Sequence, residues 1–200
     1  MSSFFLLSTE LLLCTEVFKT HLHGLLSLSE VLSLGHQLLE RGSFGGARAL
    51  LIPVFEQCLR NQENASEFDS CHPDVNELRS ILAATYEKQS MSANALFFLN
   101  QMLEVASQVH GLTHLKTADC LHRCGICYYQ QGSLAQALIH LNRARIIYEN
   151  QLNEPSPPPE IVVQGLEAIW GAIQKIHSEM AEREKANNIK IVRLSEACNV

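Results

Sequence analysis

Three closely spaced cysteines, Cys120, Cys124 and Cys127, form the first group in the sequence whose type and spacing suggest chemistry. Thiolates separated by three and then two residues can hold an iron–sulfur cluster or a zinc ion. The same stretch has the apolar spacing of a buried helix, in which Cys124 takes a core position and acts as a small hydrophobic residue. We therefore predict that these thiols lie in the core and bind no metal.

The other polar residues give no second candidate for metal or acid–base chemistry. None of the nine histidines combines the i, i+4 spacing with a nearby carboxylate, as zinc enzymes require. The sequence also has no Gly-x-Ser-x-Gly nucleophile motif, no phosphate-binding glycine loop and no paired carboxylates. We predict no catalytic residue, no cofactor and no metal site, and hence no enzymatic activity of the chain itself.

The composition narrows the class of protein. Of the 200 residues, 46% are hydrophobic and 18% are charged, which is typical of a globular domain. A net charge of −6 without a basic stripe makes nucleic acid an unexpected partner. The apolar start lacks the basic region of a signal peptide, and no run reaches the ~18 residues of a membrane span. Together with an odd number of cysteines, seven, these features predict a cytoplasmic protein that binds no membrane.

An internal repeat organises the middle of the chain. The segment that begins at His72 aligns with the one at His114 when the sequence is shifted by 42 residues. An earlier copy around Gly42 aligns with the stretch around Gly132 after a shift of 90 residues. Other matched pairs are Tyr86 and Tyr128, Ala95 and Ala137, Leu99 and Leu141, and Ser43 and Ser133.

Each copy of the repeat has the pattern of two helices. Apolar residues recur at steps of three and four, and no sustained alternation indicates a strand. Small residues recur at equivalent places, where two antiparallel helices need a close approach. These are Gly35, Ala83 and Gly125 in the first helix, and Ala47, Ala95 and Ala137 in the second. The pattern predicts an all-α fold, an antiparallel helix-pair solenoid.

Two residues of the second copy depart from the pattern. Arg79 takes a place that is otherwise large and apolar, and Ser90 replaces the glycine between the two helices. We expect both to need a local explanation in the structure.

The small–aromatic–alanine spacing of Gly125, Tyr128 and Ala137 resembles the tetratricopeptide repeat, over about residues 28–175. The 42-residue period, opened by the letters HPDV at His72, is similar to the repeat of kinesin light chains. Long repeats of this kind also resemble the C-terminal helical domain of SET-and-MYND lysine methyltransferases. The resemblance implies a tetratricopeptide-like superhelix whose first helices line a concave groove.

We divide the chain into four parts: an apolar helix over residues 1–27, three helix-pair repeats over 28–153, a proline linker and capping helix over 154–186, and a disordered tail over 187–200. The first part is too apolar for a polar cap. Either it folds onto the first repeat or the chain is the C-terminal piece of a longer protein. An uncovered apolar helix there predicts self-association through the N-terminal segment.

The groove implied by the resemblance is the candidate site. By repeat position its lining residues are Glu77, Ile81, Ala84, Asp119, His122, Arg123, Ile126 and Tyr129. We expect it to bind a protein or peptide ligand, with Arg123 and Tyr129 as anchors, so that the chain acts as a non-catalytic adaptor or scaffold. The alternative is the helical part of a SET-and-MYND methyltransferase that lacks the catalytic domain.

Overall fold

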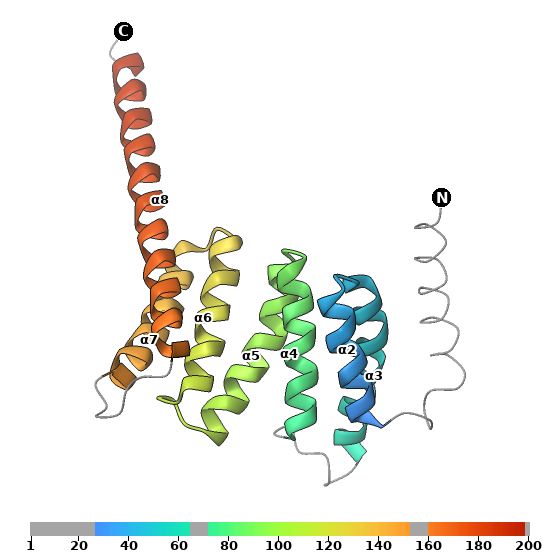
Figure 1. Ribbon diagram of the computed structural model, residues 1–200. Helices are drawn as coiled ribbons and strands as arrows, with labels where there is room; N and C mark the ends of the chain where they lie inside the picture. The colour runs from blue at the N-terminus through green and yellow to red at the C-terminus, as the bar shows by residue number, and fades with distance from the viewer. Residues whose placement is uncertain (1–26, 65–71, 153–159, 199–200) are drawn as a thin grey trace. The chain divides into compact units, whose positions relative to one another are not determined.

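The computed structural model describes residues 27–64, 72–152 and 160–198, and the regular structure within these ranges is entirely α-helical (Figure 1). The chain divides into two compact units. Unit 1 (Met1–Gly111) holds α2 (Leu28–Glu40), α3 (Phe44–Asn64), α4 (Pro73–Lys88) and α5 (Ser92–Val109). Unit 2 (Leu112–Val200) holds α6 (Leu115–Gln130), α7 (Leu134–Leu152) and α8 (Glu160–Cys198).

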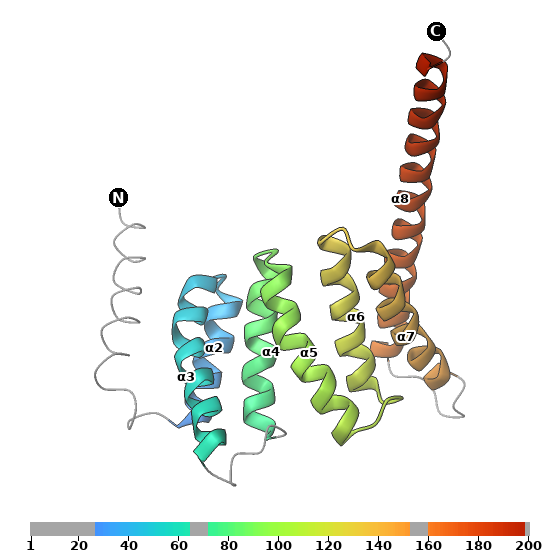
Figure 2. The same ribbon diagram turned by 180° about the vertical axis from the view of Figure 1, so that it is seen from behind.

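The helices pack as consecutive pairs, α2 with α3, α4 with α5, and α6 with α7 (Figures 1 and 2). Short turns join the two members of each pair, so the members run antiparallel. The predicted fold class, an all-α helix-pair solenoid, is confirmed.

The helix starts follow the period of the sequence. Helices α6 and α7 begin 42 residues after α4 and α5. The histidine before each first helix caps it: His72 Nδ1 accepts the N–H of Asp74 at 3.3 Å, and His114 Nδ1 accepts the N–H of Lys116 at 3.1 Å. A side-chain acceptor at this position satisfies an amide that the helix itself leaves unpaired. The recurrence of histidine therefore has a structural cause.

The close approach of paired helices depends on a small residue in the first helix and a leucine in the second. A Cβ atom added at Gly125 would lie 2.7 Å from Cγ of Leu141, and one added at Gly35 would lie 3.0 Å from Cδ2 of Leu51. Such distances leave no room for a side chain without repacking.

The inter-helix turns need a left-handed residue. Gly42 and Gly132 have φ of 71° and 76°, and Ser90, at the equivalent place, has φ of 57°. Glycine adopts this conformation without strain, whereas a residue with a Cβ atom does not. The departure noticed at Ser90 is therefore a site of backbone strain.

Arg79 is buried in unit 1, with 3% of its surface exposed. Its Nε donates a hydrogen bond to Gln101 Oε1 at 3.0 Å, and its guanidinium lies over the Phe55 ring, 5.8 Å from the ring centre. Phe98 contacts Phe55 and Tyr86, with ring centres 5.3 and 5.8 Å apart. The arginine thus fills an apolar place with its stem while its polar head keeps partners.

Helix α8 begins in the core of unit 2 and then extends past the end of α7 (Figures 1 and 2). Its buried side chains are Val162, Leu166, Ile169, Ile173 and Ile176. Trp170 lies between them in sequence but is 44% exposed, with the Arg145 guanidinium 4.9 Å from its ring centre.

The predicted disordered tail over 187–200 is wrong as far as Cys198, because α8 continues to that residue. The sequence has neither glycine nor proline after Gly171, so it contains no signal that ends a helix. The earlier boundary rested on the absence of an apolar packing pattern, which is not needed for helix continuation.

The predicted apolar helix over 1–27 and the proline linker lie almost wholly outside the described residues, and the expectations about them stay predictions. Ser27, which is described, caps α2 in a capping box with Glu30. In the described ranges, no helix has both the length and the apolar character that crossing a membrane requires.

Gly125→Ala should destabilise unit 2 by about 1–2 kcal/mol, because the cost of overpacking against Leu141 exceeds the gain in helix propensity. Gly171→Ala is the matched control. It also lies inside a helix, but nothing stands within 4 Å of its added Cβ atom, so it should stabilise by about 0.5–1 kcal/mol. Urea unfolding followed by circular dichroism measures both. Equal effects of the two substitutions would contradict the packing argument.

Ser90→Gly should stabilise the protein by about 1 kcal/mol, because it removes the left-handed strain at the α4–α5 turn. The reciprocal change Gly132→Ser, at the equivalent turn of unit 2, should destabilise by a similar amount. Thermal unfolding of both variants tests the pair. A loss of stability in Ser90→Gly would show that the serine makes a contact worth more than the strain.

Candidate functional site

A cavity of about 490 Å³ opens in unit 2 where α6, α7 and α8 meet. We call it the α6–α8 cavity. Its lining residues are Leu115, Lys116, Asp119, His122, Tyr148, Ile161, Gln164 and Gly165. The volume suits one or two side chains of a bound polypeptide.

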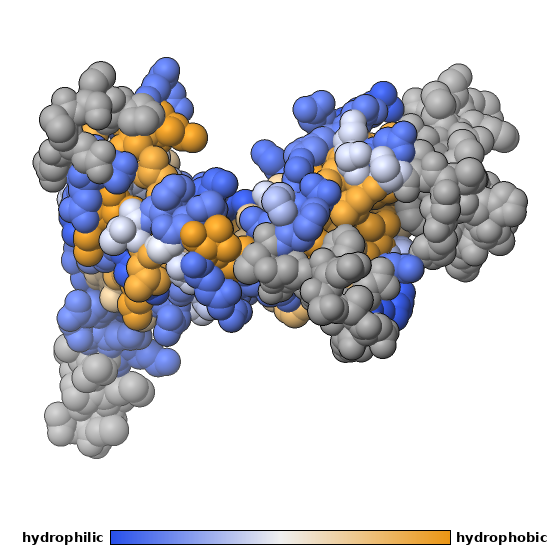
Figure 3. All heavy atoms as spheres, turned by 90° about the horizontal axis from the view of Figure 1, so that it is seen from below, coloured by the Kyte–Doolittle hydropathy of each residue, from blue (hydrophilic) through white to orange (hydrophobic). Residues whose placement is uncertain are grey.

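The walls of the α6–α8 cavity combine apolar and polar groups. The α6 residues from Leu115 to His122 recur at three- and four-residue steps, which places them on one side of the helix. Across from them α8 supplies Ile161, which is 68% exposed, and Gln164, whose Nε2 donates to Glu160 Oε1 at 2.8 Å. Seen from below, unit 2 shows apolar side chains among hydrophilic ones (Figure 3).

Gly165 lets α8 approach Tyr148 of α7. A Cβ atom at this glycine would lie 3.1 Å from the tyrosine ring and 3.4 Å from its hydroxyl oxygen. Tyr148 is 5% exposed. Burial raises the pKa of its phenol above the ordinary value of 10, and the nearby Asp119 and Cys120 raise it further. The phenol is therefore a neutral polar group beside the cavity at physiological pH.

Two of the predicted groove residues, Asp119 and His122, line this cavity. Arg123, Ile126 and Tyr129 are half-buried on α6 and do not line it. Tyr129 instead lies beneath the amine of Lys175 on α8, 5.3 Å from the ring centre. The α6 part of the predicted site thus contacts or borders α8.

The three predicted residues of α4 lie in unit 1. Glu77 is exposed and its Oε1 is 3.0 Å from His36 Nε2 on α2. Ala84 is half-buried. The assignment of Ile81 to an open groove is wrong, because only 1% of its surface is exposed. Its side chain belongs to the core of unit 1.

The sequence analysis missed the α8 side of the cavity. Ile161 and Gln164 stand 42 residues after Asp119 and His122, so the repeat period itself points to them. Lys116 and Tyr148 carried no comparable signal, because neither position was assigned to the groove from the repeat.

The cysteine group behaves differently from a metal site. Cys120, Cys124 and Cys127 are buried on α6, with 4% or less of each exposed. In the part of the chain that the structure describes, no group of three or more His, Cys, Asp or Glu side chains is arranged to hold a metal ion. His140, on α7, stacks on the Tyr128 ring with centres 5.0 Å apart.

Comparison with known protein families concerns the middle of the chain. Residues 74–150 match the family model of the tetratricopeptide repeat. This region is tetratricopeptide-like. The match covers α5 and α6 and most of α4 and α7, so it includes Asp119 and His122 but not α8. No curated protein matches the chain significantly.

The match supports the class of protein-interaction modules, since tetratricopeptide repeats generally bind other proteins. It does not separate one tetratricopeptide family from another. The likeness to kinesin light chains and to the helical domain of SET-and-MYND methyltransferases therefore stays a prediction.

Asp119→Asn should lower the pKa of Tyr148, because it removes a charge that opposes phenol ionisation, while burial should still hold the pKa above 10. The ultraviolet difference titration near 295 nm, with Tyr148→Phe as the assignment standard, measures this shift. Because the folded-state pKa is raised, the associated stability is present below pH 10 and is lost as the pH rises through the folded pKa.

Glu167→Gln is the control for this titration. It removes a carboxylate from α8 that is not among the groups raising the Tyr148 pKa, and the Tyr148 component should not move. An unchanged pKa in Asp119→Asn would contradict the placement of Asp119 beside the phenol.

Proposed function

We propose that unit 2 binds a short segment of a partner protein at the α6–α8 cavity, and that the chain acts as a non-catalytic adaptor or scaffold. One observation carries the proposal. Asp119 and His122 on α6, and Ile161 and Gln164 on α8, occupy equivalent positions one period apart and line a single cavity in a tetratricopeptide-like protein.

The chemistry of the walls suits a peptide with an aliphatic anchor residue. Leu115 and Ile161 offer apolar surface, and Ile161 loses exposed area when it is covered. Lys116, Asp119 and Gln164 offer donors and acceptors for a peptide backbone, which keeps its polar groups paired on binding. The partner is thus recognised by one buried side chain and by backbone hydrogen bonds.

The half-buried residues further along α6 extend the contact surface. Tyr129 and Arg123 are of the types that most often dominate binding energy at protein interfaces. The Lys175 amine over the Tyr129 ring holds that side chain against α8, so its position is fixed before binding. Ile126 provides apolar area between them in sequence.

Ile161→Asp should abolish peptide binding, because a carboxylate at the cavity wall cannot be covered by an aliphatic side chain without a large desolvation cost. A random peptide library is selected against the wild-type chain, and affinities are measured by fluorescence anisotropy. We expect selected peptides to share an aliphatic residue and to lose at least about tenfold in affinity, which corresponds to 1.4 kcal/mol.

Ile139→Asp is the matched control, because Ile139 is a similarly exposed isoleucine on α7 of the same unit and does not line the cavity. Binding should be retained in this variant. Peptides that bind Ile161→Asp as tightly as the wild type, or a library that yields no binder at all, would refute the proposal.

A further inference from the structure

The second half of α8 lacks a neighbour within unit 2. From residue 180 to residue 190 every side chain is exposed, whereas the first half of the helix supplies five buried side chains to the core. We call residues 180–198 the α8 overhang; it extends beyond α7 in both ribbon views (Figures 1 and 2).

A helix of this length is only marginally stable in water when nothing packs against it. One intrahelical ion pair is described at the start of the overhang, in which Arg183 Nη2 donates to Glu179 Oε1 at 2.6 Å. Such exposed i, i+4 pairs stabilise a helix only slightly. A covering partner would supply the missing stabilisation.

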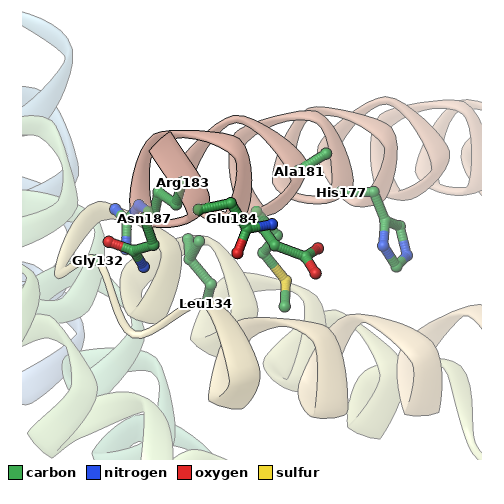
Figure 4. Close-up of a pocket in the computed structure, with 9 residues that line it drawn as sticks. Gly132, Leu134, His177, Ala181, Arg183, Glu184 and Asn187 are labelled. Atoms are coloured by element: carbon green, nitrogen blue, oxygen red, sulfur yellow. The ribbon is translucent and has the colours of Figure 1, made fainter. Parts of the chain in front are cut away.

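The root of the overhang borders a wide cavity of about 800 Å³, which we call the root cavity (Figure 4). One side is formed by the α6–α7 turn and the start of α7, at Gly132 and Leu134. The other side is formed by α8 residues that include His177, Met180 and Glu184. Met180 is 41% exposed, so apolar surface is available at this corner.

The root cavity lies on the same side of α8 as its buried stripe. Met180 follows Ile173 and Ile176 at the same helical spacing, and Glu184 and Asn187 continue the line. A second helix placed against this stripe would therefore extend the packing that α7 provides to the first half of α8.

The charges of the overhang indicate which helix fits. Between residues 179 and 190 the acidic side chains stand nearer the root and the basic ones nearer the tip. In chain order they are Glu179, Glu182, Arg183, Glu184, Lys185 and Lys190. An antiparallel second copy sets the acidic root of one overhang against the basic tip of the other, and it does so twice. A parallel copy sets like charges side by side.

We infer that the protein forms a two-fold dimer through antiparallel pairing of the α8 overhangs, each helix end entering the root cavity of the other copy. The occupant of the exposed stripe is thus a second copy of this chain. The inference is independent of peptide binding at the α6–α8 cavity, which lies where α8 begins.

Charge reversal in the full-length chain tests the pairing. Glu184→Lys makes the root basic against a basic tip, and Lys190→Glu makes the tip acidic against an acidic root. Each variant alone should dimerise at least about tenfold more weakly than the wild type in sedimentation equilibrium, since both symmetric contacts turn repulsive. An equimolar mixture of the two variants should restore a dimer, because each chain then complements the other.

Glu167→Lys, the same charge change on α8 outside the overhang, is the control and should leave the dimer unchanged. A wild-type monomer at about 100 μM, where a specific micromolar dimer is saturated, would overturn the inference. So would a dimer that both reversals leave intact, which would place self-association elsewhere, such as the predicted N-terminal surface. Failure of the mixed variants to associate would overturn the antiparallel orientation.

Discussion

The contact between a small residue in the first helix of a pair and a leucine in the second governs how this protein is built. Gly35 meets Leu51 and Gly125 meets Leu141 at distances that exclude a side chain. Ala83 and Leu99 have the same sequence spacing and are both fully buried. Because helices that approach closely must have matching lengths and turns, the same contact explains why the capping histidines and the left-handed turn residues recur with it.

The candidate site depends on that constraint indirectly. Once α6 and α7 are held together by Gly125, Tyr148 of α7 is available to the next helix, and Gly165 lets α8 settle against its ring. The α6–α8 cavity is the space left at the mouth of this contact, where the side chains of Asp119 and Ile161 meet no packing partner across from them. A binding surface thus forms as a by-product of repeat packing, as is common where function is carried by a surface on a repetitive scaffold.

Much of the fold could be predicted because the repeat is written in residues that packing constrains strongly. The small positions, the capping histidines and the turn glycines each have one physical role, so a shift of 42 residues identifies them without knowledge of the fold. Ile81 was placed wrongly because groove and core positions on a first helix differ by less than one residue of rotation. Lys116 and Tyr148 were missed because cavity walls come from three helices, and the repeat aligns only equivalent helices.

The length of α8 was the other feature that the sequence pattern understated. A packing pattern ends where the neighbouring helix ends, but a helix ends only where its own sequence stops it, and nothing between Gly171 and Cys198 does. The two limits coincide in α4 to α7 because a turn with a left-handed or capping residue follows each helix closely. In α8 they separate, so one helix contributes its first half to the core and to the α6–α8 cavity and leaves its second half as a surface. The division of α8 into these two parts therefore follows from where α7 begins, and the charge order beyond that point is free to serve association.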